Sequence, residues 1–333
     1  MEACNVAILG ATGAVGREML AQLEERNFPV KNLKLLSSAK SAGKKITFKG
    51  SEITVAEAAE DAFKGVDIVL GAAENDISKR FAPAIKASGA VYVDNSSAFR
   101  LDKDVPLVIP EINPGDIAMH NGIIANPNCS TIIALVAANP ISSLSPIKAM
   151  VASTYQAVSG AGAGGITELE GQLSAFPKCE TVSPSVFQYQ IALNLIPQIG
   201  SFGENGYTSE EMKMQNEGRK ILHLPEMKVS CTCVRVPVMR SHSISLTVIT
   251  ENEVSVKDAC EAIAGAPGCR LYDDVSALKY PMPLLTSGQD LVYVGRIRKD
   301  LAFENAISLW CCGDQIRKGA ATNAVQIAEL LLK

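Results

Sequence analysis

The sequence of 333 residues lacks the features that would tie it to a membrane or to nucleic acid. No apolar run approaches the roughly 20 residues that a membrane-spanning helix needs. Lysine and arginine form no basic run, and a net charge of -4 argues against a nucleic-acid binder. The chain passes from Met1 almost directly into a strand-like segment, so we expect no signal or transit peptide. These absences favour a chain whose partners are small molecules.

A disulfide framework is absent as well, because the nine cysteines are odd in number and scattered. This pattern predicts a reduced, cytoplasmic protein. Cys231 and Cys233 alternate along a strand-like run and should share one face, but no histidine or second cysteine pair lies nearby in the sequence. We interpret the pair as core packing and predict no metal site. The nine are Cys4, Cys129, Cys179, Cys231, Cys233, Cys260, Cys269, Cys311 and Cys312.

The first part of the chain alternates short strands with helices. Asn5–Leu9 is a continuous apolar strand of the kind that is buried on both faces of a parallel sheet. The apolar residues of 13–25 and 77–87 have helical spacing. This βαβ pattern predicts a Rossmann-type α/β domain with a doubly wound sheet. The further strands are expected at 33–36, 66–70 and 91–94.

After Cys129 the pattern changes to long strands interrupted by single helices, which predicts an α+β domain with a mixed sheet. We therefore divide the chain into a nucleotide-binding domain, 1–128 with 314–333, and a catalytic and dimerisation domain, 129–313. The expected strands are 148–156, 228–236 and 243–250, and the expected helices are 132–138, 210–222 and 318–332.

A glycine-rich turn joins the first strand to the first helix. Its glycines allow a tight turn and let backbone N–H groups approach a pyrophosphate at the helix N-terminus. In this context the turn predicts a dinucleotide site. Its residues are Gly10, Thr12, Gly13, Ala14, Val15 and Gly16.

The nucleotide can be inferred from the end of the second strand. An acid there would accept a hydrogen bond from a ribose 2′-OH and indicate NAD. The segment 37–45 instead carries hydroxyls and cations and no acid, which favours the 2′-phosphate of NADP; a merely solvated basic loop is the alternative. The residues expected at the phosphate are Ser37, Ser38, Lys40 and Ser41.

Cys129 lies in the segment NPNCST, directly before an apolar run that predicts a helix. A thiol at a helix N-terminus is exposed to the positive end of the helix dipole and to unpaired N–H groups, and both favour the thiolate. A buried structural cysteine is the alternative interpretation. Together with a nicotinamide site, however, a thiolate predicts aldehyde chemistry through a thioester.

Such chemistry needs a base and cations, and the chain offers candidates, most of them in its second half. Arg235 and His242 flank an expected strand connection, and Glu210 and Lys213 would share one helical face. Arg100 ends the loop that follows the strand 91–94. Each also has a structural interpretation, as an ordinary histidine or as a surface ion pair.

Together these segments resemble the aspartate-β-semialdehyde dehydrogenase family, in order and over nearly the whole chain. The matching segments are GATGAVG at 10–16, SAKSAGK at 38–44, VDNSSAFR at 93–100, VIPEINP at 108–114, NPNCST at 126–131, YQAVSGAG at 155–162, EEMKM at 210–214, RVPVMRSH at 235–242 and KGAATNAVQIAE at 318–329.

The resemblance implies reversible conversion of L-aspartyl-4-phosphate and NADPH to L-aspartate-4-semialdehyde, NADP and phosphate, on the route to lysine, threonine, methionine and diaminopimelate. It implies Cys129 as the nucleophile, His242 as the general acid/base and Gln156 as the residue that orients the substrate. Of the substrate-binding residues, Arg235 would take the α-carboxylate and Glu210 the amino group. Phosphate would lie with Arg100 and Lys213, and Asn128 would also contact substrate.

The resemblance implies three further features. Ser159, Gly160 and Asn323 belong to segments that close around the cofactor, and the C-terminal helix packs on the nucleotide domain. Members of the family form homodimers or tetramers. Lys40 stands where the family often has arginine, so a point charge replaces a planar fork and discrimination against NAD should be weaker.

Two alternative functions remain at this stage. An N-acetyl-glutamyl-phosphate reductase would use the same thiol and cofactor, but an acetylated amine needs no carboxylate such as Glu210. A catalytically silent paralogue would lack the thiol or the histidine, and both are present. Glyceraldehyde-3-phosphate dehydrogenases share the thiol chemistry but not these motifs.

Overall fold

The structure is a computed structural model and describes residues 2–178 and 183–332. It divides into two compact units, 1–128 with 320–333 and 129–319. The division expected from the sequence placed 314–319 with the first unit. Those residues pack in the second unit because Asp314 and Gln315 bond there to Arg240 and to the Ser241 amide. Cys179 lies outside the described residues.

The first unit is built on a parallel sheet with the strand order β5-β2-β1-β6-β7-β8. β1 is buried at every position except the partly buried Asn5, which explains the continuous apolar sequence from Val6 to Leu9. The expected doubly wound Rossmann-type architecture is confirmed. The strands are β1 (Cys4–Leu9), β2 (Val30–Ser37), β5 (Ala56–Glu57), β6 (Ile68–Gly71), β7 (Val91–Asp94) and β8 (Ile123–Ala125), and a separate hairpin joins β3 (Lys45–Phe48) and β4 (Ser51–Thr54).

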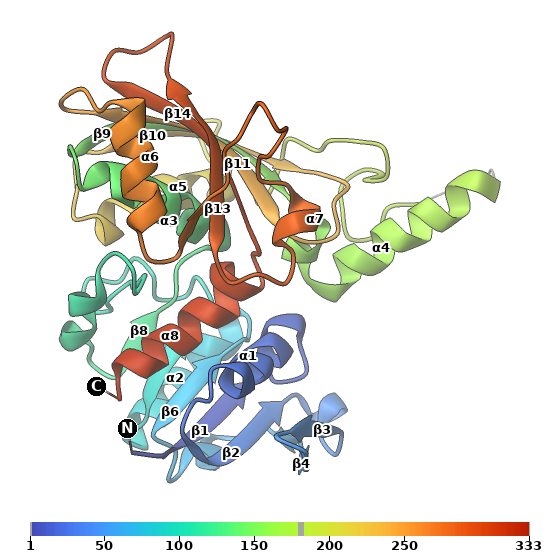
Figure 1. Cartoon of the computed structure of the whole chain (residues 1–333). Helices are drawn as coiled ribbons and strands as arrows, with labels where there is room; N and C mark the ends of the chain where they lie inside the picture. The colour runs from blue at the N-terminus through green and yellow to red at the C-terminus, as the bar shows by residue number, and fades with distance from the viewer. Residues whose placement is uncertain (1, 179–182, 333) are drawn as a thin grey trace. The chain divides into compact units, whose positions relative to one another are not determined.

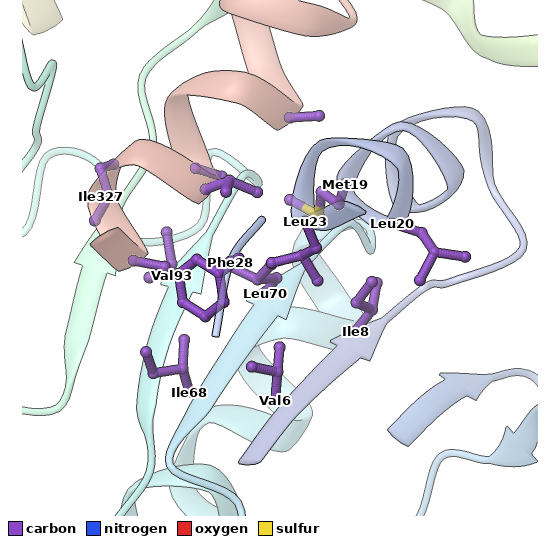
Figure 2. Close-up of a cluster of buried hydrophobic side chains, with 14 of the residues drawn as sticks. Val6, Ile8, Met19, Leu20, Leu23, Phe28, Ile68, Leu70, Val93 and Ile327 are labelled. Carbon is purple, nitrogen blue, oxygen red and sulfur yellow. The ribbon is translucent and has the colours of Figure 1, made fainter. Parts of the chain in front are cut away.

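Two helices of the first unit, α1 (Ala14–Glu25) and α8 (Thr322–Leu330), pack against each other beside this sheet. Figure 2 shows Met19 and Leu23 of α1, Ile327 of α8 and the strand residues Ile8 and Leu70 within one buried cluster. The C-terminal helix therefore packs on the nucleotide domain, as expected. The remaining helix is α2 (Asn75–Ala87), and the short 3₁₀ turns are 39–41, 60–63 and 114–119.

The second unit has a mixed sheet with the strand order β10-β9-β11-β14-β13-β12, in which β9–β10 and β12–β13 are parallel pairs and the other pairs are antiparallel. This confirms the expected α+β architecture. The strands are β9 (Ile147–Gln156), β10 (Lys228–Arg235), β11 (His242–Thr250), β12 (Cys269–Leu271), β13 (Val292–Lys299) and β14 (Ala306–Gly313).

Helices pack on this sheet, and α3 (Cys129–Ser142) is the most deeply buried of them (Figure 1). Its sequence is apolar all round because the sheet, α5 (Ser209–Ile221) and α6 (Val256–Gly265) surround it. α4 (Gly162–Ala175) projects from the unit in Figure 1, and α7 (Pro283–Thr286) is a single turn. Short 3₁₀ turns cover 158–161 and 176–178, and 317–321 is π-helical.

The described residues form no helix long and apolar enough to cross a bilayer. Cys231 and Cys233 are both buried on β10, with their sulfurs 3.7 Å apart, so the expected placement on one face is confirmed. The eight described cysteines form no disulfide among themselves.

Candidate active site

A cavity of about 490 Å³ in the first unit lies over the glycine-rich turn. Gly10, Thr12 and Gly13 line it, and Ser37 and Ser38 follow at the end of β2. Gly10 has φ +88°, and a Cβ on it would lie 2.5 Å from the Ala72 carbonyl oxygen, so no other residue fits this turn. No side chain caps the N-terminus of α1, which leaves its first N–H groups available to a phosphate.

A cluster of hydroxyls stands beside this cavity. Thr12 Oγ1 lies 2.8 Å from Ser37 Oγ and 3.4 Å from Ser41 Oγ, and the exposed Lys40 belongs to the same turn. Donors and a cation at the end of β2 suit the 2′-phosphate of NADP, so the site fits this cofactor.

The structure also adds residues that the sequence analysis missed. The additional lining residues come from the turn after β2, from the end of β5 and the residue after it, from the segment after β6 and from α2: Ala39, Glu57, Ala58, Ala72, Ala73, Glu74, Ile77, Arg80 and Phe81, with Leu9 at the end of β1. The signal that could have located the segment after β6 is the sheet order, because β6 neighbours β1 and the carboxyl ends of parallel strands share one edge. Glu57 pairs in register with Ser37.

Three other predicted residues of the first unit are buried in its polar network. Arg100 donates from Nε to the Asn126 carbonyl at 2.9 Å and from Nη2 to the Asn95 carbonyl at 2.7 Å. Asn323 donates to Asn126 Oδ1 at 2.6 Å and to the Val108 carbonyl at 3.0 Å. Asn128, also buried, ends the first of the two segments that form this unit. The substrate and cofactor roles of these residues stay predictions.

Cys129 is the first residue of α3, and it is partly exposed. Its Sγ lies 3.5 Å from Nε2 of His242, the first residue of β11. The chain passes close by at Gly319, where a Cβ would lie 3.0 Å from the Cys129 Cβ. The second unit thus brings together a thiol at a helix N-terminus and an imidazole, although 113 residues separate them.

The backbone of Ala157 forms hydrogen bonds with both His242 and Arg235. Its N–H donates to His242 Nδ1 at 3.0 Å, and its carbonyl accepts from Arg235 Nη1 at 2.7 Å. Gly160 lies against both side chains: a Cβ there would be 2.8 Å from Arg235 Nη1 and 3.3 Å from His242 Cε1. Arg235 also lies over the Phe187 ring, 5.7 Å from its centroid.

A polar chain continues from His242 to α5. Gln156 Nε2 lies 3.5 Å from His242 Nε2 and donates to Glu210 Oε1 at 3.2 Å. Glu210 Oε2 in turn accepts from Lys213 Nζ at 2.8 Å, so the two residues share one helical face as predicted. Ser159, which was predicted at the cofactor, is buried, and its hydroxyl accepts from Gln315 Nε2.

Burial dominates the electrostatics of this cluster. The pKa of His242 is lowered to about 3, first by burial and then by the charge of Arg235, against an opposing effect of Glu210. Burial also lowers the pKa of Arg235, while Cys129 and Glu210 counteract it. The imidazole is therefore neutral at physiological pH, and Arg235 remains a cation.

A dinucleotide cavity on a Rossmann-type unit, together with a thiol paired to a buried imidazole on a mixed-sheet unit, defines a thiol-dependent nicotinamide oxidoreductase. The family models agree in both halves: "Semialdehyde dehydrogenase, NAD binding domain" matches residues 5–120, and "Semialdehyde dehydrogenase, dimerisation domain" matches 139–318. The chain belongs to the semialdehyde dehydrogenase family.

Individual relatives are similar over their full length. An aspartate-semialdehyde dehydrogenase of Aquifex aeolicus is 53% identical over 333 residues, which is 99% of this chain and 98% of the relative. The crystal structure of aspartate semialdehyde dehydrogenase II from Vibrio cholerae complexed with ASA has a TM-score of 0.97 at 44% identity and covers 100% of this chain and 99% of that one. The Candida albicans enzyme with NADP has a TM-score of 0.76 at 25% identity, covering 99% of each chain.

Proposed function

We propose that the chain catalyses the reversible, NADPH-dependent reductive dephosphorylation of L-aspartyl-4-phosphate to L-aspartate-4-semialdehyde and phosphate through a thioester on Cys129. This is a step towards lysine, threonine, methionine and diaminopimelate. The observation that carries the proposal is the 3.5 Å approach of Cys129 Sγ to His242 Nε2 at the start of α3, beside Arg235.

The surroundings of the thiol match the substrate group by group. Arg235, buried and cationic, suits the α-carboxylate because its planar fork can donate two hydrogen bonds. The Glu210 carboxylate suits a free amino group, and Gln156 bridges it to the imidazole. A carboxylate in this position favours aspartyl phosphate over an N-acetylated substrate. Lys213, which is paired with Glu210, and Arg100 are the proposed phosphate ligands, and Asn128 is proposed only as a further substrate contact.

The cavity of the first unit would hold NADP, with its pyrophosphate at the turn 10–16 and its 2′-phosphate near Thr12, Ser37 and Ser41. When bound, the cofactor supplies or accepts hydride at the acyl carbon. We also infer a homodimer or tetramer, supported by the dimerisation-domain match, and a cytoplasmic location, supported by the free thiols.

Phosphate dependence tests this function. Purified protein should reduce NADP with aspartate semialdehyde only when phosphate or arsenate is present, because an oxyanion must cleave the thioester. Equal rates without any oxyanion would indicate a hydrolytic aldehyde dehydrogenase and overturn the proposal. Oxidation of N-acetylglutamate semialdehyde in preference to aspartate semialdehyde would support the alternative acyl-phosphate reductase.

Cysteine variants provide the matched control. Cys129→Ser should abolish turnover and leave NADP binding intact, as measured by fluorescence titration. Cys260→Ser should remain active, since Cys260 is the other described cysteine that is only partly buried and it lies on α6. Activity in the Cys129 variant would assign the nucleophile elsewhere.

A further inference from the structure

We propose that Glu168 of α4 is a positioning residue for substrate binding, because it fixes the chain segment that places Phe187 against the guanidinium of Arg235. This role rests on the proposed function in one respect, the binding of the substrate α-carboxylate by Arg235. All the contacts that support it lie within the second unit.

Glu168 is a buried carboxylate that accepts hydrogen bonds from a distant part of the chain. Its Oε2 accepts from the Ser185 N–H and from Ser185 Oγ, both at 2.9 Å, and also from the Val186 N–H. Burial opposes a charge on this side chain, but the Val186 and Ser185 donors outweigh it and lower the pKa of Glu168 below its ordinary value. The ionised carboxylate therefore binds the start of the segment 185–192.

Gln172, one turn further along α4, binds the end of the same segment. Its Oε1 accepts from the Ile191 N–H at 2.9 Å and from the Ala192 N–H at 2.8 Å. Its Nε2 donates to Glu168 Oε1 at 3.1 Å, so the two side chains act together. Residues 185–192 belong to no helix or strand, so their buried N–H groups depend on such side-chain acceptors.

Apolar contacts determine where Phe187 lies within this segment. Gly165, on the same face of α4, leaves space for the ring, since a Cβ there would lie 3.1 Å from Phe187 Cζ. The ring is buried in a small cluster formed with Val158, Leu169, Ile191, Ala192 and Ile196. The position of Phe187 is therefore set by α4 and by the attachment of the segment to it.

Phe187 in turn contacts Arg235. The guanidinium carbon lies 5.7 Å from the centroid of the ring, within the range of a cation–π contact. The same segment continues to Ile196, whose N–H donates to the Arg235 carbonyl at 3.0 Å and whose carbonyl accepts from the Arg235 N–H at 2.8 Å. With Nη1 donating to the Ala157 carbonyl at 2.7 Å, the guanidinium has one defined orientation.

Orientation matters here because a guanidinium binds a carboxylate best through two parallel hydrogen bonds. A guanidinium that rotates away keeps its charge but makes one of these bonds or neither. Release of Phe187 should therefore weaken binding of the α-carboxylate and leave the groups around the thiol and the phosphate in place. KM for aspartate semialdehyde should then rise while KM for phosphate stays the same.

Glu168→Gln tests the positioning role, because the amide keeps the shape of the side chain and removes its charge. We expect KM for aspartate semialdehyde to rise about tenfold, with kcat and KM for phosphate within about twofold of the unmodified protein. Glu170→Gln is the matched control, an exposed acid on the same helix, and should change none of the three constants. An unchanged KM for aspartate semialdehyde in Glu168→Gln would overturn the proposal. A fall in kcat with a rise in both KM values would indicate a general structural role and would also overturn it.

Phe187→Leu tests the link to Arg235 and provides a second variant if Glu168→Gln does not fold. Leucine keeps the apolar packing but offers no aromatic face to the guanidinium. It should raise KM for aspartate semialdehyde by a similar factor. Adding Glu168→Gln should raise KM no further, since both changes act through one contact. An unchanged KM in Phe187→Leu, or multiplication of the two effects in the double variant, would contradict this link.

Chemical reactivity of Arg235 tests the same link without any substrate. The side chain is only 7% exposed, so phenylglyoxal should modify it slowly in the unmodified protein. Glu168→Gln and Phe187→Leu should accelerate this modification several-fold, as measured by peptide mass spectrometry, and Glu170→Gln should not. Equal rates in the variants and the unmodified protein would overturn the positioning role. Loss of phosphate dependence in the unmodified protein would instead refute the proposed function and would leave the reactivity result standing.

Discussion

At the scale of single residues, the arrangement of Arg235 and His242 depends on the absence of a side chain at Gly160. Arg235 and His242 converge there because no side chain separates them, and Ala157 supports both from behind. The family resemblance implies that Gly160 belongs to the loop that closes around the cofactor. The structure adds a packing reason for glycine that concerns the substrate side of the site.

Gly160→Ala should therefore impair substrate binding more than folding. A methyl group 2.8 Å from Arg235 Nη1 must displace the guanidinium from the Ala157 carbonyl. We expect KM for aspartate semialdehyde to rise about 10- to 100-fold, because the misplaced guanidinium binds the substrate less well. Each factor of ten corresponds to about 1.4 kcal/mol of binding free energy. Steady-state kinetics would show this.

Gly171→Ala is the matched control, because a Cβ on this exposed α4 residue meets nothing within 4 Å. It should leave KM unchanged and stabilise the helix by up to about 1 kcal/mol. A wild-type KM in Gly160→Ala would remove Gly160 from the substrate site.

At the scale of elements, α5 holds part of the site and begins with a complete capping box. Glu211 N–H donates to Thr208 Oγ1 at 3.3 Å, and Thr208 N–H donates to Glu211 Oε2 at 2.7 Å. Glu211 Oε1 also accepts from the Cys233 amide on β10 at 2.9 Å, which links the helix start to the strand that carries Arg235. The cap thus sets the position of Glu210, which lies in the first turn of α5, and of Lys213, which follows it three residues later.

Thr208→Ala should affect both stability and substrate binding. Loss of the cap costs about 1 kcal/mol of unfolding free energy, and loosening of the first turn should raise KM for the semialdehyde. Ser255→Ala removes the corresponding N-cap contact of α6, where Asp258 N–H donates to Ser255 Oγ at 3.0 Å, outside the cluster around Cys129. Denaturant titration should show a comparable loss there without a change in KM. Equal shifts of KM in the two variants would contradict the role of the α5 cap in positioning the substrate-binding residues.

At the scale of the whole molecule, the buried imidazole makes stability depend on pH. The pKa of His242 falls from an ordinary 6.5 to about 3 in the folded chain, chiefly through burial. Between these values the unfolded chain binds a proton that the folded chain does not. The contribution of the neutral His242 side chain to the free energy of unfolding is therefore fully present above pH 6.5 and is lost as the pH falls towards 3.

Lowering the pH from about 7.5 to 5 should destabilise the unmodified protein by about 2 kcal/mol more than it destabilises the His242→Gln variant. The estimate takes about 1.36 kcal/mol for each pH unit below the ordinary histidine pKa. Denaturant unfolding of both proteins at the two pH values would measure this difference. Parallel losses in the two proteins would contradict the lowered pKa.

Much of the architecture follows from the sequence alone. β1 and α1 could be predicted because a buried parallel strand and an amphipathic helix have different apolar periods, and because Gly10 requires a turn between them. The i, i+3 pairing of Glu210 with Lys213 and the shared face of Cys231 and Cys233 follow from helix and strand geometry. The position of Cys129 at the start of α3 could also be predicted, because the apolar run that forms the helix follows it closely in the sequence.

Only the tertiary structure decided what depends on residues distant in the chain. Glu57 and Arg80 line the nucleotide cavity because the sheet order brings β5, and the α2 helix that follows β6, beside the glycine turn. Asp314 and Gln315 join the second unit through contacts with Arg240 and Ser241. The protonation state of His242 depends on one backbone amide 85 residues away and on burial. The sequence determined which chemical groups are present and which lie on one turn or strand, because short-range geometry is local. Their pKa, tautomer and pairing were decided by folding, because desolvation and hydrogen bonding depend on all neighbours in space.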